Sequence, residues 1–125
     1  KERSVCSPKG TDVCKIARKI ASEMAPLLPM RLSSNLVIQT VFAVKRSIGI
    51  TAKFEYSKSH LEDALSSSGM SNNDMLAIMR KHARDGFCQP NTPNKSFIEL
   101  GGVVEYHYRF NDGSLYTQQR IDSCL

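Results

Sequence analysis

The chain has 125 residues, of which 41% are hydrophobic and 23% charged. This length and composition predict one folded domain, residues 1–125, with enough apolar side chains to build its own core. No apolar run approaches the ~18 residues that a membrane-spanning helix needs, so we expect no transmembrane segment.

The formal net charge is +5, and most of the excess lies in residues 1–33, which hold seven Lys or Arg against three Asp or Glu. A basic excess of this kind fits contact with an anionic partner, such as an acidic protein surface or a lipid headgroup. It equally fits the solvated face of a helix. No nucleic-acid-binding motif or long basic run occurs, so we expect no nucleic-acid partner.

Four cysteines frame the chain: Cys6, Cys14, Cys88 and Cys124. An even count near chain ends predicts disulfides and therefore an exported, periplasmic or secreted protein. Of three possible pairings we favour Cys6–Cys14 and Cys88–Cys124, which would stabilise the fold by roughly 2.5 and 4 kcal/mol on the chain-entropy model. The absence of C-x-x-C argues against metal or redox chemistry. The sequence begins at Lys1 and not at Met, which fits either removal of a signal peptide or a boundary chosen within a longer protein.

The first predicted element is a helix. Thr11 or Asp12 is placed to cap it, and Pro26 to end it near residue 25. One face carries an apolar stripe, which consists of Val13, Ile16, Ala17, Ile20, Ala21 and Met24. The opposite face carries Lys15, Arg18 and Lys19, a candidate surface for binding a partner. The apolar residues 27–30 are expected to plug the core.

Two strands follow, over residues 35–44 and 48–56, and form a hairpin around Lys45-Arg46. A short helix is predicted from Ser59 to Leu65, broken by residues 66–69. Ser71 and Asp74 resemble a capping box for a second amphipathic helix that ends at Gly86. Residues 89–95 are a predicted loop and 97–100 a single helical turn.

A last hairpin closes the chain, with strands over residues 104–110 and 115–121 and a tight turn at Asp112-Gly113. On the first of these strands Glu105, His107 and Arg109 share the polar face. This element order predicts an α+β fold with an antiparallel sheet of about four strands, two hairpins, helices on one face and two disulfides.

The search for catalytic residues gives little. His82 lies on an apolar helix stripe, where it is either a general base in a pocket or an ordinary rim histidine. Glu105, His107 and Arg109 are either a site or the exposed charged face of a sheet, and as such a second candidate contact surface. Known catalytic and nucleotide-binding motifs do not occur. We expect no catalytic residues, no cofactor and no metal.

The second half of the chain resembles a family of small exported bacterial proteins. The pattern combines an aromatic strand end at Phe54-Glu55-Tyr56, a helix ending in Gly86-Phe87-Cys88, the segment 100–108, the Asp112-Gly113 turn and Cys124. It is similar to the quorum-sensing-regulated virulence factor families of Pseudomonas-type bacteria, over residues 34–125. The resemblance implies export, an α+β fold and no cofactor, and it carries no catalytic residues.

These observations favour a non-catalytic periplasmic or secreted protein of a Gram-negative bacterium, virulence-associated by resemblance, that binds a protein partner. One version is an inhibitor or immunity protein against an envelope toxin, and another is a secretion-system accessory or secreted virulence factor. The rivals are a small envelope hydrolase built around His82 or His107, and a structural subunit of an envelope assembly. The sequence leaves the partner and the oligomeric state open.

Overall fold

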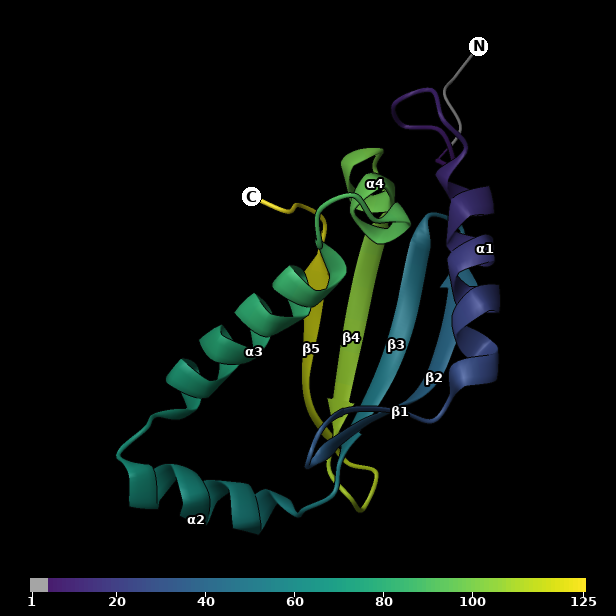
Figure 1. Ribbon diagram of the computed structural model, residues 1–125. Coiled ribbons are helices and arrows are strands. Elements are labelled where there is room, and N and C mark those ends of the chain that lie inside the picture. The colour runs from purple at the N-terminus through teal and green to yellow at the C-terminus, as the bar shows by residue number, and fades with distance from the viewer. Residues whose placement is uncertain (1–4) are drawn as a thin grey trace.

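The computed structural model describes residues 5–125, so the question of whether Lys1 is a mature N-terminus lies outside it. Its five strands are β1 (Met30–Ser33), β2 (Leu36–Val44), β3 (Ser47–Phe54), β4 (Val103–Arg109) and β5 (Leu115–Ile121). Its helices are α1 (Val13–Met24), the short 3-10 helix η1 (Ala25–Leu27), α2 (Lys58–Ser68), α3 (Asn72–Phe87) and α4 (Pro93–Glu99). Figure 1 shows how these elements form an α+β fold, as the sequence predicts.

The sheet differs from the predicted four antiparallel strands. It has five strands in the order β1-β2-β3-β4-β5, and β3 pairs with β4 in parallel. The two predicted hairpins, β2–β3 and β4–β5, are present and antiparallel. The prediction of a wholly antiparallel sheet is wrong because α2, α3 and α4 form a crossover that returns the chain to the end where β3 began, which makes the next strand parallel.

The fifth strand comes from a segment that we expected to be a core plug. Met30 opens β1, which pairs with β2 through a bulge, and Leu28 packs against the core. Leu27, by contrast, is 62% exposed. The prediction for residues 27–30 is therefore wrong in part, because Pro29 leads into an edge strand.

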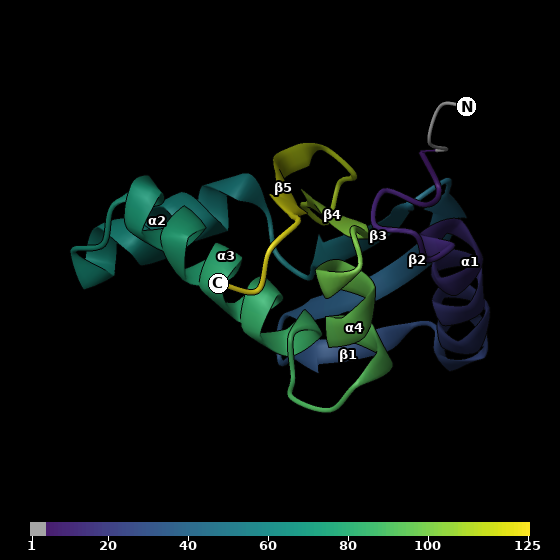
Figure 2. The same cartoon turned by 90° about the horizontal axis from the view of Figure 1, so that it is seen from above.

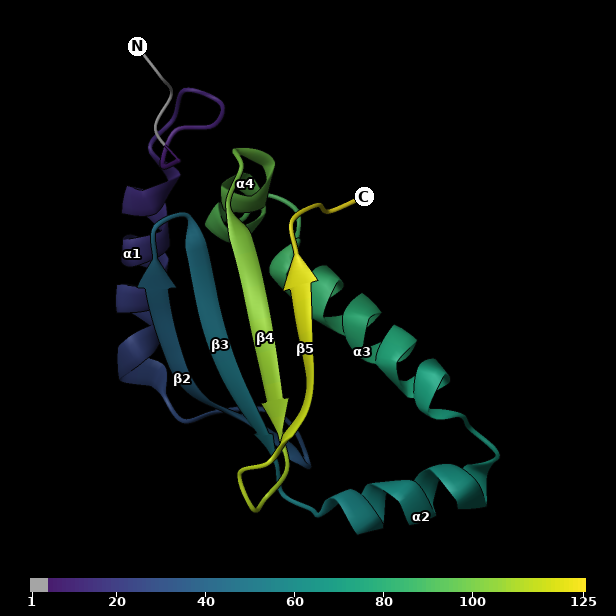
Figure 3. The ribbon, with the colours of Figure 1, turned by 180° about the vertical axis from the view of Figure 1, so that it is seen from behind.

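Helices α1, α3 and α4 lie on one face of the sheet, whereas α2 extends beyond its β5 edge (Figures 1 and 3). Figure 2 shows α1, α3 and α4 on the same side, and Figure 3 shows β2 to β5 uncovered on the other. Alternation along the strands explains this arrangement: Ile48, Ile50 and Ala52 of β3 are buried on the helix side of the sheet, together with the fully buried Phe97 of α4. Burying such side chains contributes about 1.5–3 kcal/mol each.

Helix boundaries follow local capping more closely than residue composition. Asp12 accepts a hydrogen bond from the Lys15 amide at the start of α1. Ser57, not Ser59, caps α2, and the helix continues through the serine run to Ser68, whose hydroxyl donates to carbonyls one turn back. Gly69 then ends α2 in the left-handed region, at a φ of 70°.

The capping box of α3 is present, with the Ser71 and Asp74 side chains each accepting from the other's backbone amide. The predicted end at Gly86 is wrong, since α3 continues to Phe87 and Cys88 is its C-cap. The predicted loop over 89–95 is shorter than expected because Thr92 caps α4 and Pro93 occupies its first turn.

Both disulfides have the favoured pairing. Cys6–Cys14 joins the N-terminal loop to α1, and Cys88–Cys124 joins the end of α3 to the segment after β5, with Cα atoms 5.0 and 5.7 Å apart. Within the described part of the chain, no helix combines the length and apolar character needed to cross a membrane.

Candidate functional site

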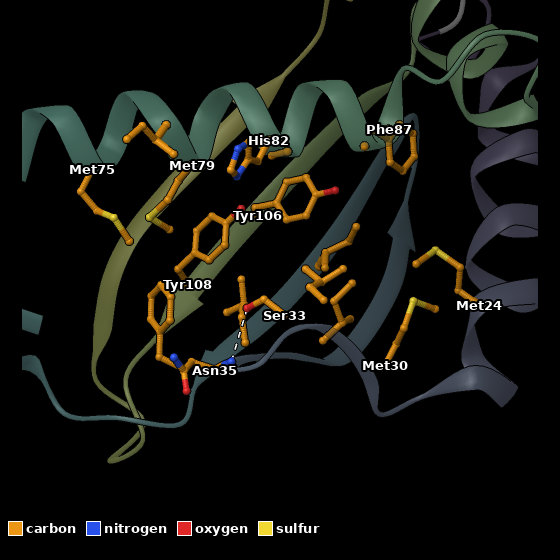
Figure 4. A pocket seen from close by; sticks show the side chains of 18 of the residues that line it. Met24, Met30, Ser33, Asn35, Met75, Met79, His82, Phe87, Tyr106 and Tyr108 are labelled. Atoms are coloured by element: carbon orange, nitrogen blue, oxygen red, sulfur yellow. Dashed lines mark hydrogen bonds between the residues drawn. The ribbon is translucent and has the colours of Figure 1, made fainter. Parts of the chain in front are cut away.

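An open groove of about 660 Å³ lies between the sheet and α3, on the helix-covered face. Its floor is made by β3 and β4, including Ile50, Tyr106 and Tyr108. One wall is α3, and the other is β1 with the end of α1 (Figure 4). We refer to this space as the groove.

The groove exists because α3 covers only the edge of the sheet. Tyr116 donates a 2.6 Å hydrogen bond to Asn72 at the start of α3, and the Gln119 amide donates to the Leu76 carbonyl at 3.1 Å. These bonds and the Cys88–Cys124 disulfide tie the helix to β5 and its following segment. The parts of β3 and β4 between α3 and α1 are left without a covering helix (Figure 1).

Methionines line both walls of the groove. Met75 and Met79 point into it from α3, and Met24 and Met30 face them from the end of α1 and from β1 (Figure 4). Methionine side chains are flexible and polarizable, and they adapt to the shape of a bound surface. A surface lined in this way suits an apolar partner better than a small ligand held in one fixed geometry.

The rims of the groove carry exposed apolar side chains. Ile78 of α3 is 40% exposed and Leu32 of β1 is 48% exposed, and both line the groove. Apolar side chains clustered around a concavity mark surfaces that bind other molecules.

The side chains that line the groove include no Asp, Glu, Lys or Arg. Its polar groups include two tyrosines on the floor and His82 on the α3 wall (Figure 4). Burial raises the pKa of Tyr106 to about 12 and raises the pKa of Tyr108 further, so both phenols are neutral at physiological pH.

An ion pair outside the groove holds the β1 wall in place. The Arg31 guanidinium donates to both carboxylate oxygens of Glu55, at 2.8 and 3.0 Å, and also to the carbonyls of Ser33 and Ser34. The hydrogen bond from Arg31 holds the pKa of Glu55 below its usual value. Because the pair is exposed, it adds little to stability, and its main effect is to hold β1 next to the end of β3.

The first contact surface predicted from the sequence, on α1, is exposed to solvent. Lys15, Arg18 and Lys19 all lie on the outer side of α1, and within residues 5–125 none of the three forms an ion pair.

The second predicted surface faces away from both α1 and the groove. Glu105, His107 and Arg109 alternate with the residues of β4 that face the helices, which places them on the uncovered side of the sheet. Glu105 is 3.5 Å from Arg120, and Arg109 donates to the Gly113 carbonyl. The two surfaces are therefore separate, and neither includes the groove.

The arrangement offers little for catalysis. His82 faces the groove, but no carboxylate lines it, and Ser33 belongs to the opposite wall. Among the described residues, Cys6, Asp12 and Cys14 bring ligand-type atoms close together. Both sulfurs are joined in a disulfide, so they are not available as thiolate ligands.

Sequence reasoning missed the groove. It placed Met24 on the apolar stripe of the first helix and Met30 in an apolar segment expected to plug the core, and it gave Met75 and Met79 of the second amphipathic helix no role of their own. The available signal was the clustering of methionines on these segments, but only the tertiary arrangement shows that the segments face one another across an unfilled space.

No protein-family model and no curated protein sequence matches the chain. Solved structures do match. A predicted secreted protein from Pseudomonas aeruginosa is 16% identical with a TM-score of 0.68, over 99% of this chain and all of the other. The type II secretion system pilotin AspS from Vibrio cholerae is 16% identical with a TM-score of 0.64, over 90% of this chain and 92% of the other.

A second pilotin, EpsS of the Vibrio vulnificus type II secretion system, is 14% identical with a TM-score of 0.64, over 87% of this chain and 86% of the other. At these identities the likeness is one of fold. It extends over most of the chain in all three comparisons. The resemblance to the quorum-sensing-regulated families stays a prediction. The chain therefore has the fold of two secretion-system pilotins and of a predicted secreted protein.

Proposed function

We propose that this protein is a non-catalytic binding module of the bacterial cell envelope, and that its groove binds a helical segment of a protein partner. The observation that carries the proposal is the groove itself, apolar and uncharged, in a fold shared with two type II secretion system pilotins. The two disulfides support a periplasmic or secreted location.

The geometry favours a helix as the occupant. A helix with its side chains is about 10 Å across, and helices pack on the faces of sheets. The groove leaves a strip of the sheet face between α3 and α1 without a helix, so a bound amphipathic helix would complete the layer. The groove floor is a face of the central strands β3 and β4, which offers side chains and no free backbone groups to a bound segment.

The partner is a protein component of the envelope, and a part of a secretion machinery is the first candidate because of the shared fold. An envelope toxin neutralised by an immunity protein is the alternative. Lys15, Arg18 and Lys19, and separately Glu105, His107 and Arg109, are proposed as secondary contact surfaces that modulate binding through charge.

The test is affinity capture from the native cell envelope with three matched single variants. Ile78→Asp and Leu32→Asp place a charge on opposite rims of the groove. Val44→Asp does so at a similarly exposed apolar residue outside the groove, since Ile78, Leu32 and Val44 are 40%, 48% and 55% exposed. We expect one stoichiometric partner with the wild type and Val44→Asp, and its loss with both rim variants, because a charge desolvated by a bound helix has no counter-charge.

Retention of the partner by both rim variants would contradict groove binding. Charge reversal at Lys15, Arg18 and Lys19, and at Glu105 and Arg109, would then decide whether a charged surface holds the partner. The identity of the captured protein separates a secretion component from a toxin.

A further inference from the structure

Two tyrosines on the groove floor have hydroxyls without a partner in the described chain. Tyr106 and Tyr108 are only 7% and 3% exposed, and their rings stack with centroids 5.8 Å apart. Neither hydroxyl makes a hydrogen bond within residues 5–125. The rings are buried, and hydroxyls in such surroundings are normally hydrogen-bonded, so these two oxygens meet either solvent or a bound molecule.

The two hydroxyls remain accessible from the groove. In the described part of the chain, Oε1 of Gln119 is the side-chain polar atom that is both fully buried and without a hydrogen-bond partner. The two tyrosine oxygens are therefore not fully buried. Both tyrosines line the groove and lie opposite the methionines and His82 of α3 (Figure 4). A molecule bound in the groove can therefore reach them.

A bound helix that covers β3 and β4 displaces the water next to these hydroxyls. If the helix is wholly apolar, both phenols lose their hydrogen bonds and the complex is weakened. A charged side chain is no better, because no charged side chain lines the groove to compensate it. The side chain that best replaces the displaced water is neutral and can both donate and accept a hydrogen bond, as a phenol can. Ser and Thr offer a hydroxyl of this kind, and Asn and Gln offer a carboxamide.

We propose that Tyr106 and Tyr108 determine the specificity of the groove, by selecting a helix with one uncharged hydrogen-bonding side chain in the middle of its apolar face. The flanking apolar side chains of that helix pack among Met24, Met30, Met75 and Met79. This inference rests on the proposed function, and it adds the chemistry by which one amphipathic helix is chosen over another.

The experiment uses a displayed library of amphipathic helices of ~18 residues, about five turns. Leucines are fixed along the apolar face and its central position is randomised. The library is selected against the whole oxidised protein and against the Tyr106→Phe/Tyr108→Phe double variant, which keeps both rings. We expect the wild type to enrich Ser, Thr, Asn or Gln at the central position and the double variant to enrich apolar residues.

A matched pair of synthetic peptides, with Gln or the similarly shaped Met at the central position, then measures the selectivity. The wild type should bind the Gln peptide roughly tenfold more tightly, equivalent to about 1.4 kcal/mol. The double variant should lose this preference, and the single variant Tyr106→Phe, with unchanged thermal unfolding, should retain part of it.

An equal ratio for wild type and double variant, or a preference of the wild type for Met, would overturn the inference while leaving helix binding in place. If no enriched helix depends on the groove, as judged by equal binding to Ile78→Asp, the proposed function fails and this inference fails with it.

Discussion

Helices α1 and α3 have similar apolar stripes but different surroundings. The stripe of α1 packs on β2 and β3, where Val13 and Ala17 are fully buried and Ile20 is 4% exposed. The stripe of α3 is only partly covered: Met79 is 7% exposed, but Ile78 is 40% exposed and Met75 faces the groove. The comparison shows that an amphipathic stripe predicts burial of a helix face without saying which surface covers it. That surface can belong to the same chain or to a binding partner.

The largest effect should come from removing the tether of α3. The Cys88→Ser/Cys124→Ser variant opens a link between residues 36 positions apart and should lose about 4 kcal/mol of unfolding free energy. The matched variant Cys6→Ser/Cys14→Ser, with a separation of 8, should lose about 2.5 kcal/mol. Denaturant unfolding measures both, and equal losses would show that the tether of α3 has no special weight.

Truncation of one isoleucine on each helix sharpens the comparison. Ile20→Ala removes a core side chain of α1 and should cost about 3 kcal/mol of stability. Ile78→Ala removes a side chain at the groove rim and should cost less than about 1 kcal/mol, while weakening partner binding. Chemical denaturation and a binding assay together test this, and a large stability loss with Ile78→Ala would mean that α3 is an ordinary core helix.

The capping box should matter mainly for the first turns of α3. Ser71→Ala removes the acceptor for the Asp74 amide and should cost about 1 kcal/mol. Hydrogen exchange should rise in the first turns of α3 and stay unchanged in α1. Uniform exchange changes across both helices would show that the capping box stabilises the whole domain and not the start of α3 alone.

The smallest expected effect on stability at neutral pH comes from the ionisation of a tyrosine on the groove floor. The pKa of Tyr106 is raised to about 12 by burial, so the folded state holds its phenolic proton more tightly than the unfolded state does. This contribution to stability is complete below the ordinary tyrosine pKa of about 10 and is lost as the pH rises through about 12. Ultraviolet titration of wild type and Tyr106→Phe should show that the ionisation lost in the variant lies near pH 12, and a lost ionisation near pH 10 would contradict the raised pKa.

The sequence predicted most elements because their signals are local. Asp12, Ser71 and the alternation around Tyr106 each determine structure within a few residues, and the cysteine positions near element ends favoured the observed pairing. It did not predict the parallel pairing of β3 with β4, which depends on the path of the whole crossover, or the strand at Met30, which pairs only once β2 is in place.

The candidate site was beyond local reasoning for the same reason. Met24, Met30 and Met79 are each consistent with a core position, and only the arrangement of α1, β1 and α3 around the sheet leaves them facing a space. The charged surfaces of α1 and β4 were easier to predict, because exposure of a polar face follows directly from periodicity.

The central claim, that the groove binds a protein partner, is tested most directly by site-specific photo-cross-linking in living cells. A photoreactive phenylalanine analogue is placed at Ile78 on the groove rim, and in a second strain at Thr51 of β3, which is paired with His107 on the uncovered face. We predict a strong cross-link to one envelope protein from Ile78, and a weak one or none from Thr51. Cross-linking from Thr51 with none from Ile78 would contradict the account and assign partner binding to the uncovered sheet face.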